Sequence, residues 1–400
     1  INSTRAFTAF NSLDGGFYKT PVGRVKTPTL AMVVRREEDI NKFVSDPFFE
    51  INVNFTTAKG EYTGKYFDKN FKKDKENQKL KESRIWDRHL ALEIMKEISG
   101  KGGEAFDETK TLSQSPPLLF DLTSLQRDAN NRFGFSAKNT VGLAQALYDR
   151  HKLITYPRTD SKFLPKDYVA TVKETISSLQ SLPSYKRYCS EALKLNLVSD
   201  KHKVFNDKKV SDHFAIIPTG IAYKKLSEPE LKLFDLIVKR FLGVFFPPAK
   251  YLNTKRITTV KNYTFKTEGK VLVEPGWQEL YMDSKSILKE SLIALDDNGK
   301  VTCAKITLDE LETKPPAHYT EATLLSAMET AGKLVEDDVQ REAMVEKGIG
   351  TPATRAGIIE ELIKDNYLIR DGRDLLISHS SSRLMQLLDG LNIKELSRAD

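Results

Sequence analysis

Two β-rich stretches stand far apart in this chain, and a long helical region separates them. Residues 48–66 and 251–310 alternate apolar and polar side chains, as strands with one buried face do. Residues 113–248 and 316–400 have helical patterns instead. This order predicts a β domain that is interrupted by a helical insertion.

We therefore predict a mixed α and β fold with three domains, two of them discontinuous. Their boundaries are 1–46 with 316–400 for one helical body, 47–112 with 249–315 for the β-rich domain, and 113–248 for a second helical domain.

An internal similarity links the two helical regions. "TVGLAQALYDRHKLIT" from Thr140 and "RAGIIEELIKDNYLIR" from Arg355 each indicate an amphipathic helix followed by a strand, and another helical pattern precedes each. At one fixed offset the matching residues are Gly142 with Gly357, Leu147 with Leu362, Leu153 with Leu368, and Ile154 with Ile369.

The second copy continues into "YLIRDGRDLLIS", in which Asp-Gly between two apolar runs predicts a β-hairpin. Two helices and a hairpin are typical of a winged helix-turn-helix, a common nucleic-acid binding unit. Helix pairs also serve as scaffolding or as protein contacts, so the repeat alone leaves the function open.

Composition narrows the class of protein. The 400 residues carry a net charge of +7 with a pI of about 9.0, which is compatible with a polyanionic partner without requiring one. The two cysteines, Cys189 and Cys303, form no C-x-x-C motif, which indicates a reducing compartment and no structural zinc site. The sequence shows no membrane-spanning run and no signal peptide.

"LITYPRTDSKF", residues 153–163, is the stretch most suggestive of chemistry. Pro157 pushes Tyr156 into an extended conformation, so Tyr156, Arg158 and Asp160 are expected to share one face. A phenol, a guanidinium and a carboxylate aimed together indicate a phosphate-reactive site. The alternative is a strand with a surface ion pair.

A tyrosine phenol is a weak nucleophile, with a reference pKa of about 10, until a neighbour stabilises the phenolate. Arg158 could do so, or it could hold a phosphate with two parallel hydrogen bonds. A phosphotyrosine ester would keep the energy of the broken phosphodiester, so resealing would need no ATP.

Three further motifs could support such a site. His213 in "SDHFAIIPTG" could donate to a phosphate oxygen, or be a packed residue. The start of the helix in "GIGTPATRAG", residues 348–357, could bind phosphate or be an ordinary helix cap. "PVGRVKTPT", residues 21–29, is an extended basic stretch.

Together, "ITYPRTDS", "DHFAIIPT", "VGRVKTPTL", "HYTEATLLSAMETAG" and "IGTPATRAGIIEELI" resemble the type IA DNA topoisomerases. The topoisomerase III branch of bacteria is the most similar, the motifs occur in family order, and they cover essentially the whole chain. The resemblance implies a four-part ring in which one DNA strand is cut, its 5′ phosphate is held on tyrosine, another strand passes, and the cut is resealed.

The resemblance assigns roles by motif. Tyr156 is the expected nucleophile, and Arg158 and His213 are its catalytic partners. Single-stranded DNA is the expected partner. The expected DNA-binding residues are Arg5, Arg24, Lys26, Thr27, Asp160, Ser161, Thr351, Thr354 and Arg355. Lys26 stands where many relatives carry glutamine. In the family's ring, the β-rich domain is the arch, and the body formed by 1–46 and 316–400 holds the DNA.

One departure from the family pattern is large. The family begins with a Toprim domain that carries a glutamate, a D-x-D cluster for Mg²⁺ and a lysine, and this chain has no D-x-D. We therefore expect a piece of a longer protein: it binds single-stranded DNA but does not cleave alone, and Mg²⁺ belongs to the missing domain rather than to these residues. A monomer in the bacterial cytoplasm, at the nucleoid, is also expected.

Two other classes of protein share some of these features. A non-enzymatic winged-helix protein that binds nucleic acid would explain the repeat but not the Tyr156 face. A tyrosine recombinase would need several dispersed arginines with an H-x-x-R motif and a nucleophilic tyrosine near the C-terminus, whereas this chain has no H-x-x-R and Tyr156 lies in its first half.

Overall fold

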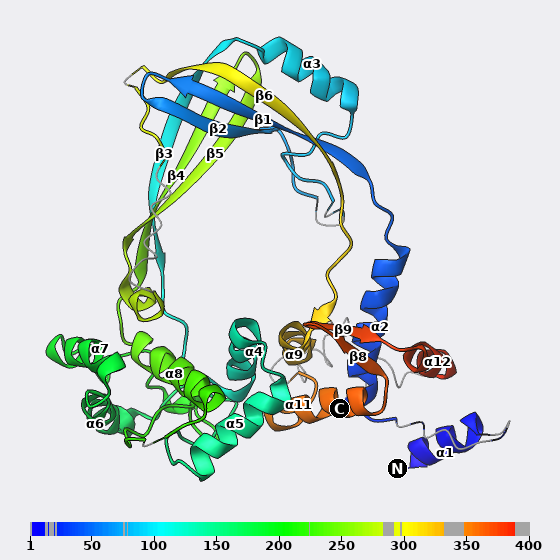
Figure 1. The fold of residues 1–400 in the computed structure, drawn as a ribbon, viewed down its shortest axis with the longest axis vertical. Coiled ribbons are helices and arrows are strands. Elements are labelled where there is room, and N and C mark those ends of the chain that lie inside the picture. The colour runs from blue at the N-terminus through cyan, green and yellow to red at the C-terminus, as the bar shows by residue number, and fades with distance from the viewer. Residues whose placement is uncertain are drawn as a thin grey trace. The chain divides into compact units, whose positions relative to one another are not determined.

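The computed structural model describes residues 2–12, 15, 20, 22–74, 77, 79–223, 225–282, 292–296, 298–331 and 348–388. The chain divides into two compact units (Figure 1). We call residues 1–42, 117–246 and 316–400 the helical unit, and residues 43–116 and 247–315 the β unit.

The β unit is built on a closed antiparallel sheet with the strand order β1-β2-β5-β4-β3-β6. Its elements are β1 (Pro47–Thr57), β2 (Gly60–Phe67), α3 (Arg88–Ile98), β3 (Gly102–Gln114), β4 (Ala249–Val260), β5 (Tyr263–Glu274), the short helix η3 (Gly276–Tyr281) and β6 (Lys300–Glu312).

Strands from the two distant stretches pair with one another within this sheet. β1 pairs with β6 as well as with β2, and β3 pairs with β4 from Glu104 to Gln114. Both stretches therefore lie in one β unit, and residues 117–246 of the helical unit stand between them in the sequence. Helix α3 packs on β1 and β6 and was not anticipated from the sequence.

A buried ion pair lies within this unit. Arg256 on β4 is fully buried, and its Nε and Nη2 donate to the two carboxylate oxygens of Asp107 on β3 at 2.7 and 2.8 Å. Nη2 also donates to the Ile293 carbonyl, and the guanidinium lies 4.3 Å from the centre of the Tyr62 ring. Asp107 and Arg256 are directly opposite each other in the β3–β4 register, so the carboxylate supplies the counter-charge that a buried guanidinium needs.

The helical unit contains the remaining elements. They are α1 (Asn2–Asn11), α2 (Lys26–Lys42), α4 (Leu122–Phe133), α5 (Ala137–Asp149), η1 (Lys166–Tyr168), α6 (Val169–Leu179), α7 (Pro183–Lys194), η2 (Asp207–Lys209), α8 (Glu228–Gly243), β7 (Tyr319–Thr320), α9 (Glu321–Glu329), α11 (Pro352–Lys364), β8 (Leu368–Asp371), β9 (Asp374–Ile377) and α12 (His379–Leu387).

The repeated sequence pattern forms two helix pairs in this unit. α4 and α5 are the first pair, and α9 and α11 are the second; α4 packs on α9, and α5 packs on α11. The predicted hairpin is confirmed, because β8 and β9 pair with Asp371 opposite Asp374. In the first copy the described residues after α5 form no such hairpin, and Ile154 makes an isolated bridge with Pro218.

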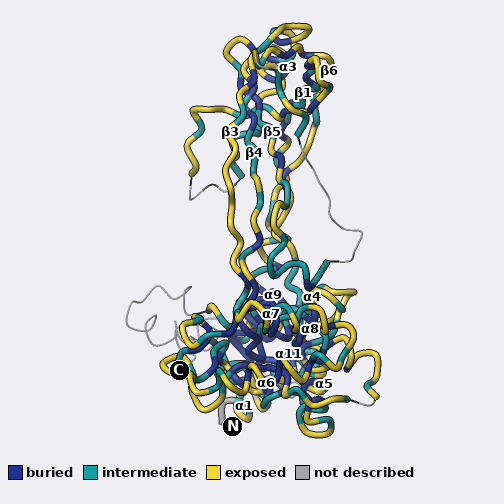
Figure 2. The backbone as a smooth tube through the Cα atoms, turned by 90° about the vertical axis from the view of Figure 1, so that its left-hand side faces the viewer, coloured by how far each residue is buried: buried dark blue, intermediate teal, exposed yellow. Residues whose placement is uncertain are grey.

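Figure 2 shows which residues along the chain are buried. The core of the helical unit brings together apolar residues of α2, α9, α11, α12 and the hairpin, so segments from both ends of the sequence share one core. Residues predicted as two separate helical domains thus lie in one compact unit, and their subdivision stays a prediction. No helix within the described ranges is long and apolar enough to cross a membrane.

We predict that Asp107→Ala lowers the free energy of unfolding by about 3 kcal/mol, because it leaves the buried Arg256 without its counter-charge. Urea denaturation at neutral pH measures the change. The matched control is Glu108→Ala, which removes the next carboxylate on β3, an exposed one paired with Lys110, and should leave stability unchanged. Equal stability of the two variants would contradict the structural importance of the buried pair.

Candidate functional site

The segment 153–163 is extended but irregular in the structure. Its side chains alternate: Tyr156 is half-buried and Arg158 and Asp160 are exposed, whereas Pro157, Thr159 and Ser161 are buried. The predicted sharing of one face by Tyr156, Arg158 and Asp160 fits this alternation. A regular strand does not form, because side chains as well as backbone groups supply the hydrogen bonds of this segment.

Hydrogen bonds to residues 213–217 hold the segment in place. Thr155 N donates to the Ile217 carbonyl at 2.9 Å, and Thr155 Oγ1 donates to the Ala215 carbonyl at 3.0 Å. Thr159 Oγ1 donates to the His213 carbonyl at 3.1 Å. The short apolar run that follows His213 is therefore the scaffold on which the tyrosine segment rests.

The aromatic rings of Tyr156 and His213 are in contact. Their ring centroids are 4.4 Å apart with an interplanar angle of 48°. These residues therefore lie together despite their separation in the sequence, and their catalytic roles stay a prediction. His213 is exposed, so its imidazole lies beside the Tyr156 phenol and is open to solvent. Arg158, two residues after Tyr156, is exposed as well. Such a group of side chains can approach a phosphate from solvent.

The start of α4 connects the tyrosine segment to the C-terminal motif. Leu122 N donates to the Thr159 carbonyl at 3.0 Å, so the first residue of α4 touches the segment directly. The next residue, Thr123, accepts a hydrogen bond at 3.1 Å from Nη1 of Arg355 on α11. Arg355 Nε also donates to the Ile349 carbonyl at 3.1 Å.

Arg355 is a buried cation, with 3% of its surface exposed. Burial lowers the pKa of its guanidinium, and the carboxylates of Glu329, Asp121 and Asp160 act in the opposite direction. Asp160 belongs to the tyrosine segment, so the charge of that segment favours the protonated guanidinium of the "GIGTPATRAG" motif.

The two basic motifs at opposite ends of the chain also meet. A Cβ placed on Gly350 would lie 3.0 Å from Val25 Cγ1, which shows that the 348–357 turn packs on the 21–29 stretch. Lys26 Nζ lies 2.5 Å from Asp365 Oδ2, so α2 is joined to the end of α11 by a partly buried ion pair. Gly348 has φ +63, and a Cβ there would come within 2.4 Å of the Met328 carbonyl, so this turn needs glycine.

The predicted DNA-binding residues fall into two groups. Arg5, Arg24, Asp160, Thr351 and Thr354 are exposed. Lys26, Thr27, Ser161 and Arg355 are buried and bonded within the protein. Contact with DNA stays a prediction for both groups, but the second group already has structural partners.

A network of charges beside the segment was not anticipated from the sequence. Asp121 caps α4 and is buried; burial raises the pKa of its carboxyl, and Lys162 and Ser124 counter this effect. Lys162 Nζ lies 3.3 Å from Asp121 and 3.8 Å from Glu329, and Arg127 lies 3.3 Å from Glu329. The only signal in the sequence was Asp121 followed three residues later by Ser124, a pattern that indicates a capped start of a helix.

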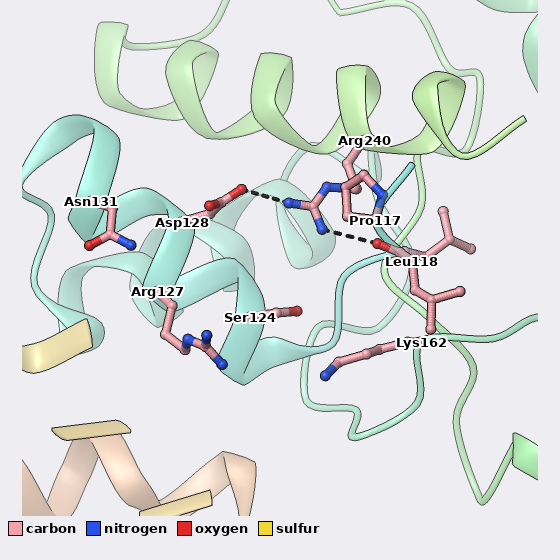
Figure 3. A pocket seen from close by; sticks show the side chains of 9 residues that line it. Pro117, Leu118, Ser124, Arg127, Asp128, Asn131, Lys162 and Arg240 are labelled. Atoms are coloured by element: carbon pink, nitrogen blue, oxygen red, sulfur yellow. Dashed lines mark hydrogen bonds and ion pairs between the residues drawn. The ribbon is translucent and has the colours of Figure 1, made fainter. Parts of the chain in front are cut away.

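Part of this network lines a pocket of about 340 Å³ (Figure 3). Figure 3 shows Arg127 and Lys162 on one side of it, and Arg240 on the other, where Arg240 donates to Asp128 at 2.7 Å and to the Leu118 carbonyl at 3.0 Å. Each cation of the pocket thus has a carboxylate partner, and the pocket has little net charge to offer an anion.

The described part of the chain contains no candidate metal site. Within those residues, no three His, Cys, Asp or Glu side chains are grouped so that they could hold an ion. No chemical step is assigned here to Mg²⁺, which the resemblance places in the Toprim domain.

The family model described as DNA topoisomerase matches residues 1–399. DNA topoisomerase 3 of Bacillus subtilis is 38% identical, and that of Bacillus licheniformis 39% identical; each match covers 97% of this chain and 52% of the relative. The chain therefore spans about half the length of the curated relatives it matches.

A solved structure shows the same fold. Full-length topoisomerase I from Thermotoga maritima matches with a TM-score of 0.66 and 23% identity, over 94% of this chain and 56% of that one.

Arg355→Ala should destabilise the protein by about 3 kcal/mol, because it removes a buried cation from the carboxylates around it. Arg24→Ala is the matched control, since Arg24 is an exposed arginine of the adjoining motif and its loss should leave stability unchanged. Thermal and urea unfolding measure both. An Arg355→Ala protein as stable as the parent would show that the cation does not hold these segments together.

Proposed function

The chain belongs to the DNA topoisomerase family, and from this premise we propose that it is part of a type IA enzyme of the topoisomerase III kind. Such an enzyme cuts and reseals one DNA strand without ATP, and so changes DNA supercoiling or linkage. The observation that carries the proposal is the contact between the Tyr156 and His213 rings beside the exposed Arg158.

The chemical step follows from these side chains. The Tyr156 hydroxyl oxygen attacks a backbone phosphorus, the bond from phosphorus to the 3′ oxygen breaks, and a 5′ phosphotyrosine ester forms. The phenol loses its proton, and the departing 3′ oxygen gains one. Resealing is the reverse attack by the 3′ hydroxyl, and the ester supplies the energy for it.

Arg158 and His213 are assigned to the phosphate. The guanidinium of Arg158 can donate two parallel hydrogen bonds to phosphate oxygens, and His213 can donate one from its ring. Both are exposed and flank Tyr156. They would stabilise the charge that builds up on the phosphate during attack.

The exposed residues of the other motifs are proposed to bind the strand. Arg24 and Arg5 would contact backbone phosphates, and Thr351 and Thr354, at the start of α11, would add hydroxyl contacts. Lys26, Thr27, Ser161 and Arg355 would act indirectly, since their buried contacts fix the shape of this surface.

The remaining proposals rest on the resemblance. Mg²⁺ would be bound by a Toprim domain in a longer protein, and this chain alone would bind single-stranded DNA without cleaving it. The helix pairs, the second with its hairpin, would be winged-helix-like DNA-binding bodies. The protein would act as a monomer at the bacterial nucleoid, in the cytoplasm.

The chain should bind single-stranded DNA more tightly than duplex DNA, and its affinity should fall as salt rises, because phosphate contacts release counterions. Fluorescence anisotropy with a labelled oligonucleotide and its duplex at several salt concentrations measures this. Arg24→Ala should weaken binding and flatten the salt dependence by about one ion. Lys42→Ala, at the far end of α2, is the control and should bind normally. Equal affinity for both forms at moderate salt would contradict the proposal.

The covalent step is tested with a fusion in which the N-terminal segment of a curated relative is joined to residue 1 of this chain. We call this fusion the joined protein. It should form a covalent complex with a single strand labelled at its 3′ end, and Tyr156→Phe should abolish both the complex and plasmid relaxation. Binding should remain, since only a hydroxyl is lost. Denaturing electrophoresis detects the complex.

The same experiment separates the alternative function. A non-enzymatic nucleic-acid binding protein would bind DNA and form no covalent complex under any condition. A complex that persists in Tyr156→Phe would instead place the nucleophile on another residue.

A further inference from the structure

The Tyr156 ring contacts a second aromatic ring, which has no part in the proposed chemistry. Tyr148, in the last turn of α5, lies with its ring centroid 5.4 Å from that of Tyr156, and the planes meet at 75°. This is an edge-to-face contact, one of the favoured arrangements of aromatic pairs. His213 contacts Tyr156 as well, at 4.4 Å and 48°, so two rings restrict how the phenol can rotate.

The turn that follows Tyr148 is fixed by α8. Arg150 and His151 both contact the carboxylate of Glu230, in the first turn of α8. Burial alone would raise the pKa of Glu230, but hydrogen bonds from Ser227, Arg150 and His151 lower it to about 2. Glu230 therefore stays ionised and keeps the end of α5 in position.

Lys152 completes this arrangement in an unusual conformation. Its φ of +57 is left-handed, which is uncommon for a residue other than glycine and occurs most often where the surroundings enforce it. Thr219 Oγ1 donates to its carbonyl at 2.7 Å. Its Nζ lies 5.5 Å from the centre of the Tyr148 ring, so the backbone turn places a cation on the ring that contacts Tyr156.

A half-buried nucleophile on an irregular segment needs such a restraint. In-line attack requires the phenol oxygen within a narrow range of distance and direction from phosphorus, and a misplacement of about 1 Å can slow a reaction by about a hundredfold. The backbone of the segment is anchored at Thr155 and Thr159, on either side of Tyr156, but these bonds do not set the orientation of the ring.

We propose that Tyr148 is a positioning residue, which holds the Tyr156 ring for attack through the edge-to-face contact. The proposal rests on Tyr156 being the nucleophile. Because the contact is made by the ring, a phenylalanine at position 148 should serve equally well. An aliphatic side chain should not, even where it fills the space.

The test measures the rate of covalent complex formation by the joined protein at saturating single-stranded DNA, and the affinity separately. In Tyr148→Leu the rate should fall by about tenfold or more, with affinity within about twofold of the parent. Tyr148→Phe should keep both near the parental values. A normal rate in Tyr148→Leu, or an equally slow Tyr148→Phe, would overturn the proposal. So would a loss confined to affinity, which would make Tyr148 a surface for stacking bases.

A second variant and a second measurement ensure that the test can contradict the proposal. Tyr148→Met, which favours a helix and lacks a rigid ring, replaces Tyr148→Leu if that variant fails to fold. In the chain alone, without DNA, the ring proton signals of Tyr156, assigned with Tyr156→Phe, should move in Tyr148→Leu because the ring current of Tyr148 is lost. Signals that stay in place would refute the contact itself. A joined protein that forms no complex with Tyr156 intact would count against the proposed function, whereas the signal shift judges the contact independently.

Discussion

A single buried guanidinium joins the parts of the helical unit that matter for the site. Arg355 lies at the start of α11, yet it bonds to Thr123 at the start of α4 and to the Ile349 carbonyl in the preceding turn. Removing a cation from water is unfavourable unless charges and acceptors replace the solvent. The carboxylates of Glu329, Asp121 and Asp160 supply that charge, and they raise the pKa of the guanidinium against the effect of burial.

This arrangement explains why motifs from distant parts of the sequence form one surface. α4 touches the tyrosine segment through Leu122, and the 348–357 turn packs on Val25. Apolar packing beneath, which includes α2, α9 and α11, supplies non-directional stability. The polar contacts add direction, because hydrogen bonds and ion pairs are lost with small shifts in geometry. The exposed side chains above them can therefore keep a defined relation to one another.

The sequence allowed much of this to be predicted, and its failures have physical causes. Alternation of side chains gave the interrupted β domain, and Asp-Gly gave the hairpin that starts at Leu368, because both signals are local. The meeting of Tyr156 and His213 came from the resemblance rather than from any pattern. The partners of Lys26 and Arg355 could not be foreseen, since a basic residue in a motif looks the same whether it faces solvent or a carboxylate on another helix. Tyr148 was missed because an aromatic residue at helical spacing normally indicates core packing.

The packing of α4 on α9 and of α5 on α11 makes the two copies of the repeat behave like the subunits of an internal dimer. Glu321 of one copy accepts a hydrogen bond at 2.6 Å from the backbone of Ala137 in the other, as residues do across a subunit boundary. Excising either copy would uncover an apolar interface and a buried carboxylate at once. The two copies are therefore expected to fold together. An insertion between them should be tolerated more easily than the loss of either copy.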